Sequence, residues 1–427
     1  MADLYLRTTC RMCGGADLER VLSLTPTPPG NRFLAFDELS LPEPAYPLEL
    51  FLCGGCHHVQ LGHVVDPRIL YQRSYSYVSA TSSVFVEHLR AYAAEMIGRF
   101  ALRSPALVVD VGSNDGTCLR FFAEAGLTVL GVDPATEIAD RATRSGVETI
   151  GEFFSYELAV RLRERCGPAA FITSHNACAH IDDLEGVLRG VRHWLADDGV
   201  FVLEVGYLVD VYEHMWFDTI YHEHLDYHTV GPFGRLFDRV GLEPLGVERV
   251  SPQGGSIRIL AQRAGGPRSR DGSIEALVDL ERRKGLDRPE TFAEFGRRID
   301  ALGSRLRTLV GELKAKGKSI AGFGAPTKAT TLLSHFRLGR ETLDFIVDDN
   351  PLKQGLFLPG SHIPVVAPAR LSLDRPDYLL ILAWNFADPI MAAHRRYAEQ
   401  GGRFVLPLPV PRVIEDGEAD RRGSSAR

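Results

Sequence analysis

The chain lacks any apolar run that approaches the roughly 20 residues needed for a membrane-spanning helix. Its start, MADLYLRTTC, lacks the basic and then apolar pattern of a secretory signal, which predicts a cytosolic (cytoplasmic) protein. Basic residues are not in excess, and the formal net charge of −7 argues against partners such as nucleic acid or a membrane surface. Cysteines are few, seven in 427 residues, and in a cytosolic protein we expect metal ligands or free thiols rather than disulfides.

Four of the cysteines form two CxxC pairs, CRMC with Cys10 and Cys13, and CGGC with Cys53 and Cys56. Two such pairs predict a closed tetrahedral shell of four thiolates around a structural zinc ion. A redox pair or unrelated free thiols are the alternatives, and a neighbouring histidine could compete as a ligand. We expect the other cysteines to be buried small hydrophobic residues: Cys118, Cys166 and Cys178.

Strand and helix patterns alternate along most of the chain, which predicts the α/β class with parallel sheets covered by helices. Expected strands lie at 105–112, 127–133, 169–175, 199–206 and 254–266, and then at 318–326, 343–351, 377–385 and 403–409. A charged helical stretch at 289–317 separates the two sets. We therefore predict a zinc-binding module over 1–75, a Rossmann-like domain over 76–266, a second Rossmann-like α/β domain over 267–413 and a disordered tail over 414–427.

The stretch VVDVGSNDGTCLRFF reads as a buried strand that runs through a glycine turn into a helix. It lacks the G-x-G-x-x-G fingerprint of dinucleotide-binding loops, and suits an adenosyl amino acid better than a pyrophosphate. Glycines and free helix amides let a ligand approach closely, and an acid after the next strand can bind a ribose. A purely structural turn is the alternative. The expected cofactor-binding residues are Gly112, Asn114, Gly116, Asp133, Glu152, Phe153 and Asn176.

The order of these motifs resembles one family. CxxC…CxxC, VVDVGSNDGT, DTIYHEHLDY, GGSIR, GFGAPTK and VDDNPLKQG follow one another as in the sugar C-methyltransferases of deoxysugar biosynthesis, such as the C-3 methyltransferase of tetronitrose biosynthesis. The resemblance runs from Cys10 to about Val410. It implies S-adenosylmethionine as cofactor and a dTDP-linked 4-keto-deoxysugar as substrate, in antibiotic biosynthesis. The three-domain pattern is compatible with a monomer.

The stretch DTIYHEHLDYH, residues 218–228, gathers three histidines, two tyrosines and a glutamate. Methylation of a carbon beside a ketone needs a base near pKa 7 and a donor for the enolate oxygen, and histidine and tyrosine suit these roles. Chemistry alone does not separate His222 from His224, and in an extended segment both would share a face. A metal site and a set of hydrogen-bonded structural histidines are the alternatives.

The family resemblance implies that His224 is the base. The polar residues that match its surroundings in the family are Glu223, Tyr221, Tyr75, His180 and Asn176. The resemblance also implies that the C-terminal domain helps to hold the nucleotide. The expected substrate-binding residues are Lys328, Lys353, Asn385 and, from GGSIR, Arg258.

The expected reaction is methylation at C-3 through an enolate. Methylation at C-5, or on an oxygen or nitrogen of a nucleotide sugar, is the alternative within enzymology. A non-catalytic zinc-containing binding protein is the alternative outside it.

Overall fold

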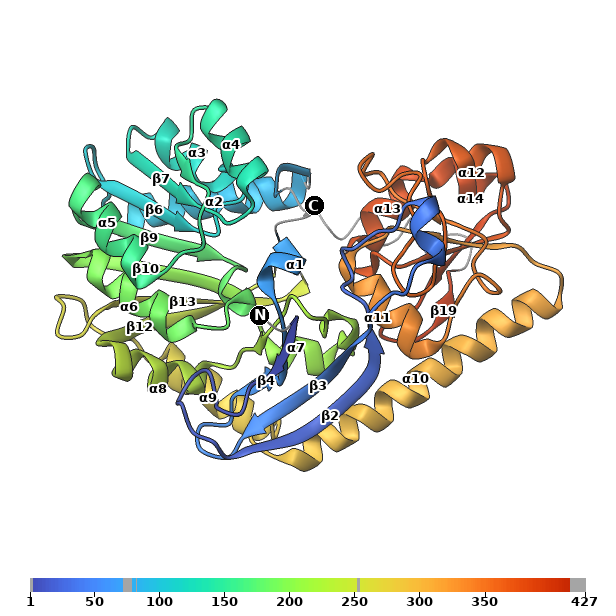
Figure 1. Cartoon of the computed structure of the whole chain (residues 1–427), viewed down its shortest axis with the longest axis horizontal. Helices are drawn as coiled ribbons and strands as arrows, with labels where there is room; N and C mark the ends of the chain where they lie inside the picture. Colours follow the sequence, from blue (N-terminus) through green and yellow to red (C-terminus); the bar gives the residue numbers. More distant parts are fainter. Residues whose placement is uncertain (1–2, 72–78, 82, 252–253, 415–427) are drawn as a thin grey trace. The chain divides into compact units, whose positions relative to one another are not determined.

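The computed structural model describes residues 3–71, 79–81, 83–251 and 254–414. The chain divides into two units, each drawn from several segments (Figure 1). Unit 1 comprises Met1–Arg20, Leu50–Asp210 and His224–Pro289, and unit 2 comprises Val21–Glu49, Val211–Glu223 and Glu290–Arg427. The predicted domain boundaries stay predictions, and the predicted tail beyond residue 414 lies outside the described residues. Within the described ranges, no helix combines the length and apolar character that crossing a membrane requires.

A seven-stranded sheet organises unit 1, in the order β12-β13-β10-β9-β6-β7-β8. Neighbours from β10 to β8 run parallel, while β13 pairs antiparallel with both β10 and β12. The strands are β6 (Leu107–Val111), β7 (Thr128–Val132), β8 (Thr149–Ile150), β9 (Ala169–His175), β10 (Leu195–Gly206), β12 (Leu242–Val250) and β13 (Ser256–Arg263). The residues of β6 are all buried, as expected for a central parallel strand covered on both faces.

Helices cover this sheet. On one face, α2 (Ser83–Arg99) and α3 (Thr117–Glu124) contribute Tyr92, Met96 and Phe122 to a core shared with Phe171 of β9. Helices α5 (Tyr156–Cys166), α6 (Leu184–Trp194) and α8 (Val230–Val240) pack in sequence, α5 on α6 and α6 on α8. Side-chain caps set helix starts: Ser155 accepts from Leu158 N at 3.2 Å at the start of α5. The remaining helices of the unit are α1 (Pro67–Tyr71), α4 (Thr136–Arg144) and α9 (Ser273–Arg283).

Short strands carry the N-terminal part of the chain. β1 (Leu4–Leu6) pairs with β5 (His63–Val65), and a four-stranded sheet has the order β11-β4-β3-β2. Its strands are β2 (Leu18–Thr27), β3 (Tyr46–Cys53), β4 (Val59–Leu61) and β11 (Asp226–Tyr227). Strands β2 and β3, and helices α7 (Leu208–Glu213) and α10 (Pro289–Ala315), continue from one unit into the other.

Unit 2 holds a six-stranded sheet in the order β16-β15-β14-β17-β18-β19, parallel except at its last strand. The N-terminal segment of this unit, Val21–Glu49, contacts the C-terminal part of the chain through an isolated β-bridge between Leu34 and Phe357. The strands are β14 (Ile320–Phe323), β15 (Ile346–Val347), β16 (Val365–Val366), β17 (Tyr378–Ile381), β18 (Arg403–Leu406) and β19 (Arg412–Val413). The helices are α11 (Thr327–Phe336), α12 (Ala369–Asp374), α13 (Ala387–Ala393) and α14 (Arg395–Glu399).

Candidate active site and zinc site

The four CxxC cysteines meet in unit 1. Cys10 Sγ lies 3.5 Å from Cys56 Sγ, Cys13 Sγ lies 3.5 Å from Cys53 Sγ, and all four sulfurs lie within 4.8 Å of one another. A tetrahedral zinc ion with Zn–S bonds of about 2.3 Å places its sulfurs about 3.8 Å apart, so the cluster fits zinc. Four thiolate ligands close the coordination shell, which makes the site structural.

The electrostatics of the cluster also favour a cation. A hydrogen bond to the neighbouring Cys10 sulfur, together with burial, raises the pKa of Cys56, and the same contact lowers the pKa of Cys10 to about 4. Burial raises the pKa of Cys53 to about 11. Four adjacent thiols, three of them buried, cannot all ionise side by side, but a divalent cation lowers the free energy of the thiolate form. Of the remaining cysteines, Cys118 and Cys178 are buried as predicted, whereas the prediction for Cys166 is wrong because it is exposed at the end of α5.

The predicted cofactor loop follows β6. Gly112 and Gly116 have φ values of 80° and 76°, and Asn114 has a φ of 50°. An added Cβ on Gly112 would lie 2.3 Å from the Cβ of Ala177, so this position requires glycine both for its backbone and for its space. The loop therefore packs against the segment that follows β9, at the carboxyl edge of the sheet, where ligands of open α/β sheets bind.

Asp133, at the end of β7, is held by this loop. Its two carboxylate oxygens accept from the backbone N–H groups of Asn114 at 2.8 Å and Ala135 at 2.9 Å. Each oxygen keeps a second lone pair, so the carboxylate can still accept from a ribose hydroxyl. Burial raises the pKa of Asp133, and burial together with the Asp133 charge raises the pKa of Asp110 to about 8. The loop thus carries one fixed acceptor where the sequence predicts ribose binding.

The segment before α2 also lies on the loop. Ser79 N donates to Asn114 Oδ1 at 2.9 Å, and Ala80 N donates to Asp115 Oδ2 at 3.1 Å. Tyr75, predicted to act at the active site, lies outside the described residues. Glu152 and Phe153 follow β8 at the same sheet edge; Glu152 forms an ion pair with Arg161 at 2.7 Å, and Phe153 is 42% exposed. An exposed aromatic ring at this edge is available for stacking on a base.

Two histidines predicted from distant parts of the chain come together in unit 1. The rings of His180 and His224 have centroids 5.0 Å apart at 69°. Tyr71 lies on the other side of His180, with its hydroxyl 3.1 Å from Nδ1. Burial, and secondly the nearby His224, lower the pKa of His180 well below its usual value, so His180 is neutral at pH 7. The pair therefore offers one neutral imidazole beside a second, partly exposed one.

Asn176 precedes this pair at the end of β9. It has a φ of 54°, a left-handed conformation that asparagine tolerates better than most residues. Its backbone N–H donates to Glu204 O at 2.7 Å, which ties the turn to β10. Its buried side-chain nitrogen has no hydrogen-bond partner in the described structure, so the amide is available to a ligand.

The structure separates the histidines of the 218–228 stretch. Residues 222 and 223 lie in a turn rather than in a strand, so the side-chain alternation of an extended segment does not apply to His222 and His224. His222 is 1% exposed and its Nε2 donates to the Tyr46 carbonyl at 3.1 Å. His228 is fully buried beside His58 and Phe233, and burial lowers its pKa to about 3. These two histidines have the environment of structural residues, whereas His224 does not.

Tyr221 and Glu223, the other predicted residues of this stretch, belong to unit 2. Glu223 is 4% exposed, and Asn31 Nδ2 lies 3.5 Å from its Oε2. Burial raises the pKa of Glu223 to about 8, against the opposing effects of Asn31 and the Lys353 charge. Burial also lowers the pKa of Lys353, so both groups are desolvated in the same region.

The predicted substrate-binding residues of unit 2 lie at the carboxyl ends of its strands. Lys328, on the first turn of α11, donates to Asn385 Oδ1 at 2.6 Å and has its Nζ 3.6 Å from the centre of the Trp384 ring. Lys353 donates to the Ala325 carbonyl at 2.9 Å. Burial lowers the pKa of Lys328. An anion beside these lysines, such as a diphosphate, would stabilise their charged forms.

Arg258 has a different environment. Its guanidinium donates to Glu204 at 3.2 Å and to Glu95 at 3.0 Å, and it lies 4.7 Å above the Tyr92 ring. At 4% side-chain exposure these contacts support a stabilising role within unit 1. The predicted substrate contact of Arg258 stays a prediction.

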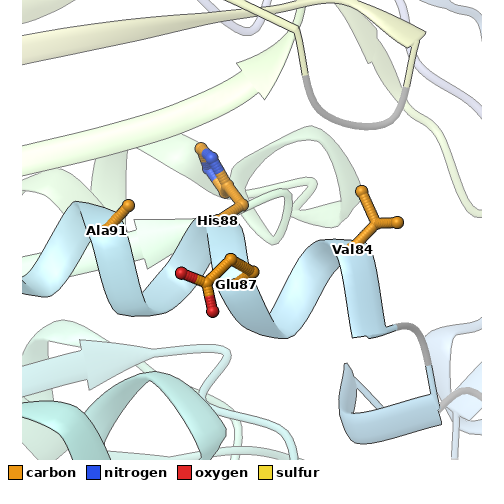
Figure 2. Close-up of a pocket in the computed structure, with 4 residues that line it drawn as sticks. All are labelled: Val84, Glu87, His88 and Ala91. Carbon is orange, nitrogen blue, oxygen red and sulfur yellow. The ribbon is translucent and has the colours of Figure 1, made fainter. Parts of the chain in front are cut away.

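A hollow on α2 lies beside this network. Figure 2 shows its four lining residues, Val84, Glu87, His88 and Ala91, all on one helix. His88 Nε2 lies 2.9 Å from Glu204 Oε1, so it extends the network around Arg258. None of the residues predicted to bind cofactor or substrate is among those lining the hollow.

Sequence reasoning missed three residues at these sites. Tyr71 contacts His180, and Asp218 accepts from the Trp384 indole at 2.7 Å. Asp218 falls within the quoted histidine stretch and Trp384 adjoins Asn385, but nothing in their spacing links them. Tyr71 lies four residues before Tyr75, where a tyrosine was expected on other grounds.

Comparisons with known proteins match the chain in three consecutive parts. Three family models match: a zinc-binding domain over residues 10–71, a methyltransferase domain over 85–247 and a C-methyltransferase C-terminal domain over 251–409. The curated protein C-methyltransferase NovU from Streptomyces niveus is 38% identical over 405 residues, covering 95% of this chain and 96% of that protein. The predicted α/β fold class, the S-adenosylmethionine cofactor and the zinc module are confirmed.

Two solved methyltransferase structures each match less than half of the chain. An S-adenosylmethionine-dependent methyltransferase from Clostridium acetobutylicum is 13% identical, with 42% of this chain and 92% of that chain covered and a TM-score of 0.34. Magnesium protoporphyrin IX methyltransferase from Synechocystis, with bound S-adenosylmethionine, is 14% identical, with coverage of 42% and 79% and a TM-score of 0.32.

Proposed function

Since the chain belongs to the C-methyltransferase family that includes NovU, and is an S-adenosylmethionine-dependent enzyme, we propose that it methylates a carbon of a dTDP-linked 4-keto-deoxysugar. The observation that carries this proposal is the pair of His180 and His224, 5.0 Å apart in the unit that contains the cofactor loop. A carbon nucleophile must be generated by proton removal, and the pair supplies a base next to a neutral partner. Methyl transfer to oxygen or nitrogen does not require removal of a carbon-bound proton.

In the proposed mechanism, His224 removes the proton from the carbon next to the sugar ketone. The electrons move onto the ketone oxygen and form an enolate. Neutral His180 carries one ring N–H, and when the Tyr71 hydroxyl donates to Nδ1, that proton resides on Nε2. Nε2 can then donate toward developing negative charge, as donors do in oxyanion holes. Bound S-adenosylmethionine supplies the electrophilic methyl group that the nucleophilic carbon takes up.

The residues of unit 2 are proposed to hold the nucleotide part of the substrate. Lys328 and Lys353 provide two part-buried cations, and Asn385 orients the first of them. A diphosphate suits two lysines because each ammonium group can donate to several phosphate oxygens. Glu223, whose pKa burial raises to about 8, can hold a proton at neutral pH and donate to a sugar oxygen. We propose Glu223 and Tyr221 as orienting groups rather than as bases, and C-3 as the methylated carbon.

The first experiment is mass spectrometry of the protein with S-adenosylmethionine and dTDP-4-keto-2,6-dideoxyglucose in heavy water. A product heavier by one methyl group, with deuterium uptake by the substrate in cofactor-free controls, would support the enolate route. NMR of the product identifies the carbon and distinguishes C-3 from C-5. A methyl group on oxygen or nitrogen in that NMR spectrum would contradict the enolate route, because such a transfer requires no removal of a carbon-bound proton.

The base assignment is tested with His224→Asn. We expect S-adenosylmethionine affinity within about twofold of the wild type but turnover lower by about 10²- to 10⁴-fold, the usual contribution of a general base. Deuterium uptake should fall in parallel. The comparison is His222→Asn, which replaces a histidine bonded to the Tyr46 carbonyl and should lower thermal stability while leaving deuterium uptake by the folded enzyme intact. Equal deuterium uptake in His224→Asn and wild type would refute the role of His224.

A further inference from the structure

Arg11 is a buried charged residue inside the first cysteine pair, between Cys10 and Cys13. It is 2% exposed, and its guanidinium reaches three other segments of unit 1. Nε donates to Asp182 Oδ1 at 2.9 Å, and Nη1 donates to the carbonyls of Leu61 at 2.9 Å and Leu225 at 3.3 Å. A planar guanidinium with several donors at fixed angles can hold such segments at defined distances.

Two of these segments carry the histidine pair. Asp182 lies two residues after His180, and Leu225 directly follows His224. The segments are also joined directly, because Leu225 N donates to the Ala179 carbonyl at 2.7 Å. One guanidinium therefore joins the Asp182 carboxylate to the Leu225 carbonyl, and these two residues closely follow the histidines whose rings lie 5.0 Å apart.

The second cysteine pair is linked to β11, the strand that directly follows Leu225. His58, two residues after Cys56, has its Nε2 2.7 Å from Asp226 Oδ1, and both side chains are fully buried. The His58 carbonyl accepts from Cys53 N at 2.9 Å. Strand β4 pairs with β11 so that Asp226 lies opposite Gln60. Both cysteine pairs thus reach the residues that immediately follow His224.

The backbone of Arg11 is fixed as well as its side chain. Its N–H donates to Gln60 Oε1 at 2.9 Å, and Gln60 Nε2 donates to the Thr9 carbonyl at 3.1 Å. With Cys10 and Cys13 as ligands of one ion, the residues between them have little freedom. We propose that Arg11 is a positioning residue that sets the spacing of His180 and His224, so that zinc binding is coupled to the geometry of the histidine pair. The catalytic consequence rests on the proposed function, but the geometric one does not.

The test compares Arg11→Lys with Arg7→Gln. Lysine keeps the charge but cannot bridge Asp182 and Leu225 with one planar group. Arg7 also donates to Asp182, at 2.9 Å, but among the hydrogen bonds and ion pairs of the described residues it contacts neither Leu225 nor Asp226. Arg7→Gln is therefore a matched control that weakens the hold on Asp182 and spares the bridge.

The first readout is the imidazole ¹⁵N spectrum of histidine-labelled, zinc-loaded full-length protein without substrate. The His180 and His224 signals are assigned by their loss in His180→Gln and His224→Asn. We expect both signals to shift in Arg11→Lys and to stay in place in Arg7→Gln, at unchanged zinc content by metal analysis. Unshifted signals in Arg11→Lys would overturn the inference whether or not the wild type methylates the sugar.

The second readout is kinetic. Loss of a residue that orients a functional group typically lowers activity by about 10- to 100-fold. We expect Arg11→Lys to lower kcat in that range with KM for S-adenosylmethionine unchanged, whereas a kcat within twofold of wild type contradicts the inference. If Arg11→Lys loses zinc, Asp182→Ala takes its place, because Asp182 lies outside both cysteine pairs and its side chain is 28% exposed. Asp182→Ala should then shift the His180 imidazole signal, and an unchanged His180 signal contradicts the proposal. A wild type that does not methylate refutes the proposed function alone.

Discussion

Gly112 offers the sharpest test of the cofactor loop. Its φ is 80°, and an alanine Cβ built there would lie 2.3 Å from the Cβ of Ala177. Non-bonded carbons pack at about 3.5 to 4.0 Å, so either the loop or the segment after β9 must move by more than 1 Å. We expect Gly112→Ala to lower both the free energy of unfolding and the affinity for S-adenosylmethionine.

The magnitude has two parts. The left-handed backbone costs an alanine about 1 to 2 kcal/mol. Overpacking against Ala177 adds about 1 to 3 kcal/mol, as for other small-to-large changes in a packed region. Gly126 provides the matched control, because its φ is 84° but an added Cβ meets nothing within 4 Å. Gly126→Ala should therefore show the backbone part alone.

The assays are urea unfolding and calorimetric titration with S-adenosylmethionine. A double-mutant cycle with Ala177→Gly isolates the steric part, since removal of that Cβ relieves the clash. We expect Gly112→Ala/Ala177→Gly to recover about 1 to 3 kcal/mol, and Gly112→Ala to weaken the cofactor at least about tenfold, equivalent to 1.4 kcal/mol. Equal losses in Gly112→Ala and Gly126→Ala, or no recovery in the cycle, would refute the reasoning.

Two further predictions concern the zinc site and a buried acid. Cys56→Ser should lose zinc by metal analysis and lower the unfolding temperature in calorimetry, because the metal stabilises the folded module; the exposed Cys166→Ser is the control, and full zinc retention in Cys56→Ser would contradict the four-thiolate site. Burial raises the pKa of Glu223 from 4.5 to about 8, so the folded chain retains a proton that the unfolded chain releases, and stability falls as the pH rises from 4.5 toward 8. Glu223→Gln removes this pH dependence. In urea unfolding, the free energy of unfolding of Glu223→Gln minus that of the wild type should increase by about 3 kcal/mol between pH 4.5 and 7. A difference that decreases with pH would contradict the raised pKa.

Much of the fold could be predicted because the signals are local. The buried strands β6, β7 and β9 and helix α3 follow from runs of apolar residues, helical periodicity and a glycine turn. The order of the segments does not reveal how they group in space. Residues 21–49 belong to unit 2, where Leu34 bridges Phe357. A contact between residues more than 300 positions apart cannot be predicted from local hydrophobic periodicity, because the periodicity reflects only near neighbours in the sequence.

Part of the candidate site could likewise be predicted from local sequence, and part of it could not. The glycine turn after β6 was predictable from the spacing of Gly112 and Gly116, while cofactor binding by this turn and by Asp133 stays a prediction. His222 and His224 were not separable from the residues alone, because they differ in their surroundings and not in their chemistry. The structure bonds His222 to a backbone carbonyl and places His224 beside His180.

The sequence by itself determined the features that depend on short spacing: the two CxxC pairs, the glycine turn after β6 and the alternation of strands and helices. Backbone geometry links residues two to five apart, so their types and spacing are sufficient evidence. Only the tertiary structure decided which groups become partners across long separations. The neutral state of His180 depends on burial, and the bridge from Arg11 to Asp182 and Leu225 depends on three segments meeting. Desolvation and these hydrogen bonds arise from packing, and packing depends on contacts between several segments of the chain rather than on any one of them.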